Sequence, residues 1–252
     1  MRGASVQVMR VLKDGALGGA ENMARDEALL TGVGSGVSEP TVRLYGWAAP
    51  TISLGYFQRY ADYVALPRPA GGLAVVRRLT GGGAILHDLE LTYSIALPVN
   101  HAWLSGGANR LYELAHDAVI AALGDLKLAA SRCGESDDSG AAKGPFFCFS
   151  RRHCYDVLVN GDKIAGSAQR RTRGAVLQHG SIILGNRFGQ QPTAATDGPF
   201  EQTLAQVRRG MVEGLGRATR CALVTGDWHD EEMRSAGALE AKYAGGEWTR
   251  RT

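Results

Sequence analysis

The segment 73–98, LAVVRRLTGGGAILHDLELTYSIALP, carries the pattern that decides the fold. Its second half alternates between two faces, with Leu91, Tyr93, Ile95 and Leu97 on the apolar one, as in a half-buried β-strand. Three successive glycines interrupt the strand pattern, and no Gly-Lys-Ser/Thr follows them as in a P-loop. We predict a β-meander in which another strand or an elongated ligand approaches the glycine backbone closely.

The rest of the chain alternates strand patterns with helical ones. We expect helices over 19–32, 105–123 and 204–215, and a fourth that Asp227 caps. In this last helix, Met233, Leu239 and Tyr243 should face inward. Two strands should flank Pro50, a hairpin should turn at Asn160-Gly161, and a further strand should cover GAVLQHGSIIL. This order predicts an α+β fold, with helices packed on a mainly antiparallel sheet.

Composition excludes several classes of protein. The 252 residues are 44% hydrophobic and 21% charged, which is ordinary for a single globular domain over 1–252. We find no apolar run of the roughly 18 residues that a membrane helix needs, and the first residues are too polar for a signal peptide. We therefore expect a cytoplasmic protein without a membrane partner. A net charge of +3 gives no reason to expect nucleic-acid binding.

The four cysteines are too few and too irregularly spaced for a disulfide framework. A zinc site from Cys148, His153 and Cys154 would match no common ligand spacing, so we expect no metal. The arginines, by contrast, are clustered, at 77–78, 151–152, 170–173 and 208–209. These clusters either form a solvated basic face or provide a contact surface for an acidic partner.

A candidate nucleophile lies in FFCFSRRHCYDVLVNGDKIAGSAQRR, residues 146–171. Positive charge nearby favours the thiolate form of a cysteine, and both Cys148 and Cys154 flank an arginine pair. Lys163 could supply a compact positive charge across the hairpin, although it could equally be an exposed hairpin lysine. The two cysteines are six residues apart, so strand alternation would place both on one face. The residues alone leave the choice open, and either cysteine could instead be a buried structural one.

Several stretches in the same order resemble the lipoate/biotin protein ligase and octanoyltransferase superfamily, over most of the chain. They are NMARDEALL, PTISLGYFQ, RRLTGGGAILHDLELTYS and KIAGSAQRRTRGAVLQHGSIIL. CFSRRHCYDVLVNGDKIAGSAQ resembles the cysteine-dependent octanoyltransferase subgroup, whose nucleophile lies seven residues before a tyrosine and an acidic residue. Counting back from Tyr155 and Asp156 gives Cys148. The resemblance gives Cys154 a packing role, and Gly83 departs from the larger residue that the subgroup often has.

The resemblance implies a biotin/lipoate protein ligase catalytic-domain fold without a C-terminal accessory domain. It implies an acyltransferase of lipoate biosynthesis, which moves octanoyl from acyl carrier protein to a lysine of an apo lipoyl domain. That acceptor would be the glycine cleavage H protein or the E2 subunit of a 2-oxoacid dehydrogenase. The acyl group would pass through a thioester on Cys148, held by the charge of Lys163, without metal or other cofactor. The arginine clusters would meet the two acidic partner proteins.

The resemblance also implies which residues line the acyl tunnel and its mouth. One wall would be formed by Arg78, Thr80, Gly81, Gly82, Gly83 and His87. The facing wall, with backbone N–H groups near the acyl carbonyl, would be formed by Gly166, Ser167, Ala168, His179 and Gly180.

Three other functions remain as alternatives. An octanoyl amidotransferase would use the same cysteine but take the acyl group from another lipoyl-domain protein. An ATP-dependent lipoate-protein ligase would need no cysteine. A non-catalytic acyl-binding protein would keep the fold alone, and the presence of both Cys148 and Lys163 argues against it.

Overall fold

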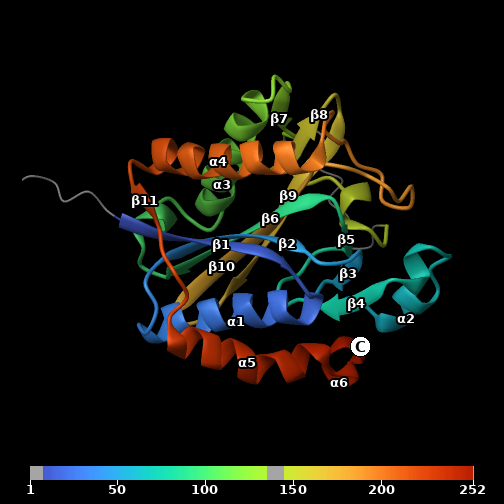
Figure 1. Ribbon diagram of the computed structural model, residues 1–252, viewed down its shortest axis with the longest axis horizontal. Coiled ribbons are helices and arrows are strands. Elements are labelled where there is room, and N and C mark those ends of the chain that lie inside the picture. Colours follow the sequence, from blue (N-terminus) through green and yellow to red (C-terminus); the bar gives the residue numbers. More distant parts are fainter. Residues whose placement is uncertain (1–7, 135–144, 252) are drawn as a thin grey trace, which may run out of the picture.

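The computed structural model describes residues 8–134 and 145–251, and within them two β-sheets carry the architecture (Figure 1). The large sheet has the strand order β11-β1-β2-β6-β10-β9-β8-β7, and the small one has the order β4-β3-β5. The strands of the large sheet are β1 Val8–Leu17, β2 Thr41–Trp47, β6 Glu90–Pro98, β7 Ala130–Arg132, β8 Val157–Val159, β9 Asp162–Arg171, β10 Ala175–Ile183 and β11 Ala222–Thr225. Those of the small sheet are β3 Thr51–Leu54, β4 Ala74–Arg77 and β5 Ile85–His87.

Helices cover both faces of the large sheet (Figure 1). One face carries α1 Gly19–Ser35, with α5 Asp230–Ala244 packed outside it and α6 Gly246–Arg250 at the end of the chain. The other face carries α3 Arg110–Gly124 and α4 Phe200–Thr219, while α2 Tyr60–Val64 lies beside the small sheet. Most neighbouring strands run antiparallel, but β1 runs parallel to both β2 and β11. The predicted α+β fold is confirmed.

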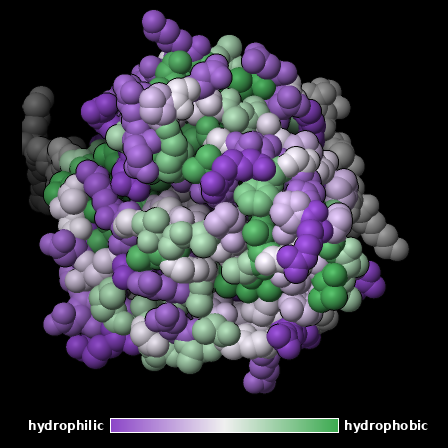
Figure 2. All heavy atoms as spheres, turned by 45° about the vertical axis from the view of Figure 1, so that its right-hand side comes forward, coloured by the Kyte–Doolittle hydropathy of each residue, from purple (hydrophilic) through white to green (hydrophobic). Residues whose placement is uncertain are grey.

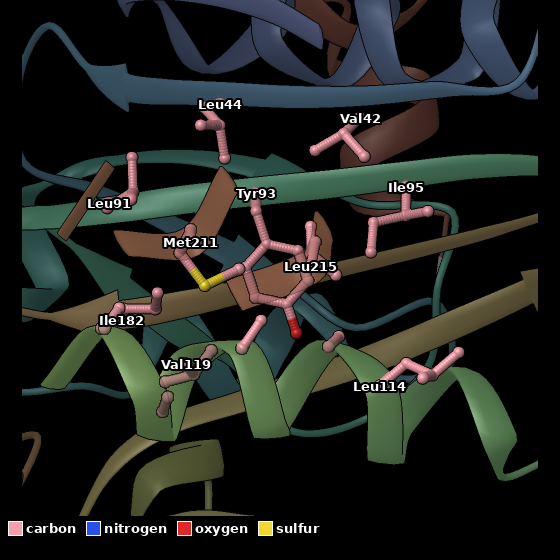
Figure 3. Packing of buried hydrophobic residues seen from close by; sticks show 14 of the residues in the cluster. Val42, Leu44, Leu91, Tyr93, Ile95, Leu114, Val119, Ile182, Met211 and Leu215 are labelled. Atoms are coloured by element: carbon pink, nitrogen blue, oxygen red, sulfur yellow. The ribbon is translucent and has the colours of Figure 1, made fainter. Parts of the chain in front are cut away.

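The main hydrophobic core lies between the large sheet and the α3–α4 layer. Figure 3 shows Tyr93 and Ile95 of β6 pointing from the sheet toward Val119 of α3 and Met211 of α4. These side chains are fully buried, and burying one Ile or Met side chain contributes roughly 1.5–3 kcal/mol. The strand alternation that predicted this apolar face places Thr92 and Ser94 on the opposite one, toward α1. One face of β6 therefore stabilises the fold, and the other is available for a polar site.

The predicted β-meander over 73–98 is wrong. Strands β4 and β5 both pair with β3 in the small sheet, whereas β6 enters the large sheet between β2 and β10. Alternation of side chains identifies a strand but not its neighbour, because pairing is decided by contacts distant in sequence. The three glycines consequently lie in the loop that precedes β5.

Several element boundaries also differ from the prediction. Helix α1 continues to Ser35 and ends at Gly36, whose φ of 77° favours glycine. His229, rather than Asp227, caps α5 through a reciprocal bond with Glu232, and Met233 is exposed. The predicted turn at Asn160-Gly161 is confirmed, with positive φ at both residues as in a type I′ hairpin.

The close approach of α3 and α4 depends on small residues, which gives a first prediction. A Cβ on Gly214 of α4 would lie 2.9 Å from the Cα of Ala118, whereas a Cβ on Gly237 of α5 would meet nothing within 4 Å. We expect Gly214→Ala to lower the free energy of unfolding by about 1–3 kcal/mol, because the helices must separate. Gly237→Ala, the matched control, should raise it by about 0.5–1 kcal/mol through helix propensity. Urea unfolding followed by circular dichroism measures both; equal effects would contradict this account of the packing.

Candidate active site

A pocket crosses the α1 side of the large sheet. Strand register places Thr92, Ser181 and Gly166 in one row on neighbouring strands, with Tyr45 of β2 continuing the row. The pocket above this face has a volume of about 470 Å³, its mouth included. Its lining comes from α1 (Met23), from β2 (Tyr45, Trp47), from the small sheet and glycine loop (Ser53, Arg78, Gly82, Ile85, His87), from β6 and β10 (Thr92, His179, Gly180, Ser181), from β9 (Gly166, Ser167, Ala168) and from the turn with Cys148 and Phe149.

Cys148 is held at the pocket by the glycine loop. It begins a short 3₁₀ turn, Cys148–Ser150, and its backbone N–H donates to the carbonyl of Ala84 at 2.7 Å. A Cβ on Gly83 would lie 2.9 Å from the Cys148 nitrogen, closer than real Cβ atoms come to backbone. Glycine at 83 therefore allows the two segments to meet. This gives a physical reason for the residue that departs from the subgroup's pattern.

Lys163 lies beneath the cysteine in a buried position. Its Nζ is 3.6 Å from Cys148 Sγ, 3.3 Å from the Cys148 carbonyl oxygen and 2.7 Å from Asp156 Oδ2. Burial alone would lower the pKa of Lys163, but the charges of Cys148 and Asp156 outweigh burial and raise that pKa above its usual range. The ammonium therefore keeps its charge at neutral pH.

A β-bulge aims Lys163 at this position. Val157 pairs with Ala165 but Leu158 pairs with Lys163, so β9 holds one extra residue, Ile164, at this point. In a regular strand, Lys163 and Gly166 would lie on opposite faces, and the extra residue reverses the alternation between them. A Cβ on Gly166 would lie 2.6 Å from the Lys163 Cε, so the absent side chain at 166 leaves room for the lysine.

The second cysteine of this segment is placed differently. Cys154 is half-buried in the loop before β8, and its Sγ lies 3.9 Å from His153 Nδ1. The hydrophobic clusters of the described residues do not include it, and its packing role stays a prediction. The argument from strand alternation fails, because both cysteines lie outside the strands.

Buried Arg78 shapes the glycine loop. Its guanidinium donates to the carbonyl oxygens of Gly81 at 2.7 Å and Gly83 at 2.6 Å, and to both the carbonyl and the hydroxyl of Ser53. Burial lowers the pKa of Arg78 to about 10, which still leaves it charged at neutral pH. Because a trans peptide directs its C=O and N–H in opposite directions, the N–H of Gly82 points away from Arg78. Gly82 has a φ of 88°, which favours glycine, and it lines the pocket.

Two histidines stiffen the pocket wall. His179 contacts Asp26 through Nδ1 at 3.0 Å and the hydroxyl of Thr80 through Nε2 at 2.6 Å. His87 contacts Glu90 through Nδ1 at 2.9 Å and the hydroxyl of Ser53 through Nε2 at 2.7 Å. Both nitrogens of each ring are thus engaged within the protein. The histidines position the wall and have no nitrogen left to bind a ligand.

The predicted site residues divide into two groups. Nine line the pocket: Arg78, Gly82, His87, Cys148, Gly166, Ser167, Ala168, His179 and Gly180. Four stand behind the lining: Thr80 against His179, Gly81 and Gly83 against Arg78, and Lys163 against Cys148.

One expectation about backbone donors is wrong. His179 and Gly180 lie on β10, which pairs with β6 on one side and β9 on the other. Their N–H groups are therefore used within the sheet, so they cannot serve an acyl carbonyl.

Sequence reasoning missed Asp156 and eight of the lining residues: Met23, Tyr45, Trp47, Ser53, Ile85, Thr92, Phe149 and Ser181. Asp156 served only as a landmark for counting, although an acidic residue at the start of a lysine hairpin is itself a signal for an ion pair. Trp47 and Met23 enter the pocket from β2 and α1, and no local pattern marks them.

Within residues 8–134 and 145–251, no group of three His, Cys, Asp or Glu side chains could hold a metal ion. None of the helices described there is long and apolar enough to span a membrane.

Comparison with known proteins agrees with this architecture. The family model for the lipoyl protein ligase A/B catalytic domain matches residues 19–210. Octanoyltransferase LipM of Kyrpidia tusciae is 34% identical over 276 residues, which cover 98% of this chain and 100% of that protein. Octanoyltransferase LipM of Moorella thermoacetica is 35% identical over 274 residues, which cover 97% of this chain and 98% of that protein.

Solved structures agree at the level of the fold. Lipoate-protein ligase A bound with ATP superposes with a TM-score of 0.73 at 21% identity, covering 97% of this chain and 98% of that one. A chain from the archaeal lipoylation system of Thermoplasma acidophilum, a bipartite lipoate protein ligase, superposes with a TM-score of 0.68 at 20% identity. The superposition covers 97% of this chain and 96% of that one. The resemblance inferred from the sequence motifs is confirmed. The chain belongs to the lipoyl protein ligase A/B catalytic-domain family, and LipM octanoyltransferases are among its relatives over nearly the whole chain.

Proposed function

We propose that the protein is an octanoyltransferase, which moves an octanoyl group to a lysine of a lipoyl domain through a thioester on Cys148. The observation that carries this proposal is the 3.6 Å contact between Cys148 Sγ and the buried ammonium of Lys163, at the edge of the pocket. The LipM relatives support the acyl group and the reaction class. Octanoyl acyl carrier protein is the proposed donor, and a single catalytic domain performs both half-reactions without metal or other cofactor.

In the first half-reaction, the Cys148 thiolate attacks the thioester carbonyl of the donor. A new S–C bond forms, the carbonyl oxygen takes the negative charge, and the intermediate collapses by expelling the pantetheine thiolate. In this proposal, the N–H of Gly82, which lines the pocket, and the ammonium of Lys163, which contacts Cys148 Sγ, stabilise the oxyanion. One well-aligned donor of this kind contributes about 2.7–4 kcal/mol to transition-state binding.

In the second half-reaction, the acceptor lysine attacks as a neutral amine. An amide bond forms, the S–C bond breaks, and Cys148 leaves as a thiolate beside Lys163, while the amine proton passes to solvent. Because its pKa is raised, Lys163 stays protonated and cannot accept that proton. Its role in both halves is to stabilise negative charge. Thioester to amide is downhill, so no nucleotide is consumed.

The octanoyl chain would lie across the strands. From Gly166 on β9 the row passes Ser181 and Thr92 and ends at Tyr45. Three inter-strand spacings correspond to about 14 Å, enough for an extended chain of eight carbons. Gly166 and Gly82 line the end of this path that lies next to Cys148, and the absence of side chains there leaves room for the acyl chain.

The thioester can be detected directly. After incubation with octanoyl acyl carrier protein, intact mass spectrometry should show an octanoyl adduct that hydroxylamine removes. The adduct should persist in Cys154→Ser, the matched control, and be absent from Cys148→Ser, because Cys148 Sγ lies 3.6 Å from the Lys163 ammonium. Acylation only by an octanoylated lipoyl domain would instead indicate an amidotransferase. Lipoylation that uses ATP and free lipoate and survives Cys148→Ala would indicate a ligase.

The charge of Lys163 can be tested by removing it. We expect Lys163→Met to slow self-acylation by about 10²–10³-fold, the loss typical of one oxyanion donor. Lys163→Arg should recover little activity, because a guanidinium is bulkier than the ammonium that packs closely on Gly166. Rapid-quench kinetics measures the rate, with exposed Lys13→Met as the control. Self-acylation of Lys163→Met at the wild-type rate would contradict the role.

Asp156 should set the pH range of the reaction. Its charge helps to raise the pKa of Lys163, so the stabilising ammonium is present at lower pH and is lost only as pH rises through that raised pKa. Asp156→Asn removes the carboxylate charge that opposes the effect of burial, so the pKa of Lys163 should fall and the ammonium should lose its proton at a lower pH. The alkaline decline of the self-acylation rate should therefore begin at lower pH than in the wild type.

The control is Asp162→Asn, which changes an exposed carboxylate of the same hairpin. Its pH–rate profile should overlay that of the wild type. If the profile of Asp156→Asn also overlaid it, Asp156 would have no influence on the ammonium.

A further inference from the structure

A cationic and aromatic surface borders the mouth of the pocket. We call it the Tyr56 surface, formed by Tyr56, Phe57, Arg170, Arg250 and Arg251. The Arg251 guanidinium lies 3.7 Å and that of Arg170 5.2 Å from the centre of the Tyr56 ring, and Phe57 is 79% exposed. Figure 2 brings the right-hand side of Figure 1 forward, and strongly hydrophilic and hydrophobic residues are interspersed over the face that it shows.

The Tyr56 surface is connected to the catalytic loops by the backbone. Gly55 is packed so closely on Gly82 that a Cβ at 55 would collide with the Gly82 carbonyl oxygen. The N–H of Tyr56 donates to the carbonyl of Thr80 at 2.8 Å. The side chain of Gln58 donates to the carbonyl of Phe146, two residues before Cys148, at 3.1 Å. A partner that touches Tyr56 is therefore at the rim of the pocket.

Buried Arg77 fixes the arginines of the C-terminal segment at this surface. Its guanidinium donates to the carbonyls of Gly55 and Gln58 in the loop and to that of Thr249 in α6. This bridge fastens α6 to the loop, so that Arg250 and Arg251 emerge beside the aromatic rings. The expectation that 77–78 belong to a basic surface is wrong, since both arginines are buried and bind backbone carbonyls.

The charges around the Tyr56 surface are predominantly positive. The hydrogen bond and charge of Arg251, followed by the charge of Arg170, lower the pKa of Tyr56. Of the nearby carboxylates, Glu27 is bound by Lys242 and Tyr243, whereas Glu247 on α6 is exposed. Such a field favours an acidic protein and speeds its encounter.

We infer that the Tyr56 surface docks the acceptor, an acidic protein domain that presents the lysine to be acylated; this inference rests on the proposed function. A lysine reaches forward only by its four-carbon stem, so the acceptor backbone must come to the rim itself. The donor carries its acyl group on a long pantetheine arm and can bind farther away. Phe57 supplies the apolar anchor, and the arginines supply charge that is complementary to the acceptor.

The experiment separates the two half-reactions. Octanoyl-enzyme is formed with octanoyl acyl carrier protein, and its deacylation is then followed with apo lipoyl domain or with hydroxylamine, a small neutral nucleophile. Arg170→Glu, Arg251→Glu and Phe57→Ala should each slow deacylation by the lipoyl domain at least tenfold. For the two charge reversals, the loss should shrink as salt is raised. Acylation and hydroxylamine release should stay at wild-type rates, which also shows that the variants are folded.

The matched control is Arg209→Glu, an exposed arginine on α4, across the large sheet from α1 (Figure 1). It should leave both half-reactions unchanged. Slower acylation by the carrier protein with unchanged lipoyl-domain transfer would assign the surface to the donor and overturn the inference, as would equal losses in Arg209→Glu or no loss at all. Failure of the wild type to form an octanoyl adduct is a separate outcome. It would overturn the proposed function and this inference with it.

Discussion

The ion pair between Lys163 and Asp156 is the interaction on which the site depends. An ammonium taken out of water is costly unless a partner compensates it, and the carboxylate at 2.7 Å supplies that partner. The surrounding backbone accommodates the pair through a bulge in β9 and the absence of a side chain at Gly166. The cysteine is brought to the same charge by a different segment, across Gly83. The site is therefore assembled around a buried cation.

A second set of buried polar groups supports the wall of the pocket. Asp26 of α1 binds Arg43 and His179, and His179 binds Thr80 beside the glycine loop. Burial alone would raise the pKa of Asp26, but His179 and Arg43 outweigh it and lower that pKa, so the carboxylate stays charged. Such a network specifies one arrangement, because any shift would leave a buried charge without its partner. The network connects helix α1, the large sheet and the glycine loop into a rigid wall, against which a flexible ligand can be held in one conformation.

Sequence alone predicted the local parts of this structure and missed those that depend on distant pairing. The Asn160-Gly161 turn and the alternation in β6 follow from backbone preferences and burial, so they could be found. The assignment of β4 and β5 to a separate sheet could not, because their apolar patterns fit either neighbour. Arg77 resembled a surface charge for the same reason, since its carbonyl partners come from two loops far apart in the chain. Cys148 and Lys163 were named from a motif, but the role of Asp156 became apparent only in three dimensions.

The bridge that Arg77 makes to α6 has a practical consequence for handling the protein. Because Arg77 fastens α6 to the loop at Gly55, which packs on Gly82 of the pocket lining, a peptide attached at the end of α6 would start close to the pocket. The chain enters β1 at the other end of the molecule, away from α6 (Figure 1). Affinity tags, fluorophores and fusion partners are therefore better carried on the amino-terminal side, where they leave access to the pocket open.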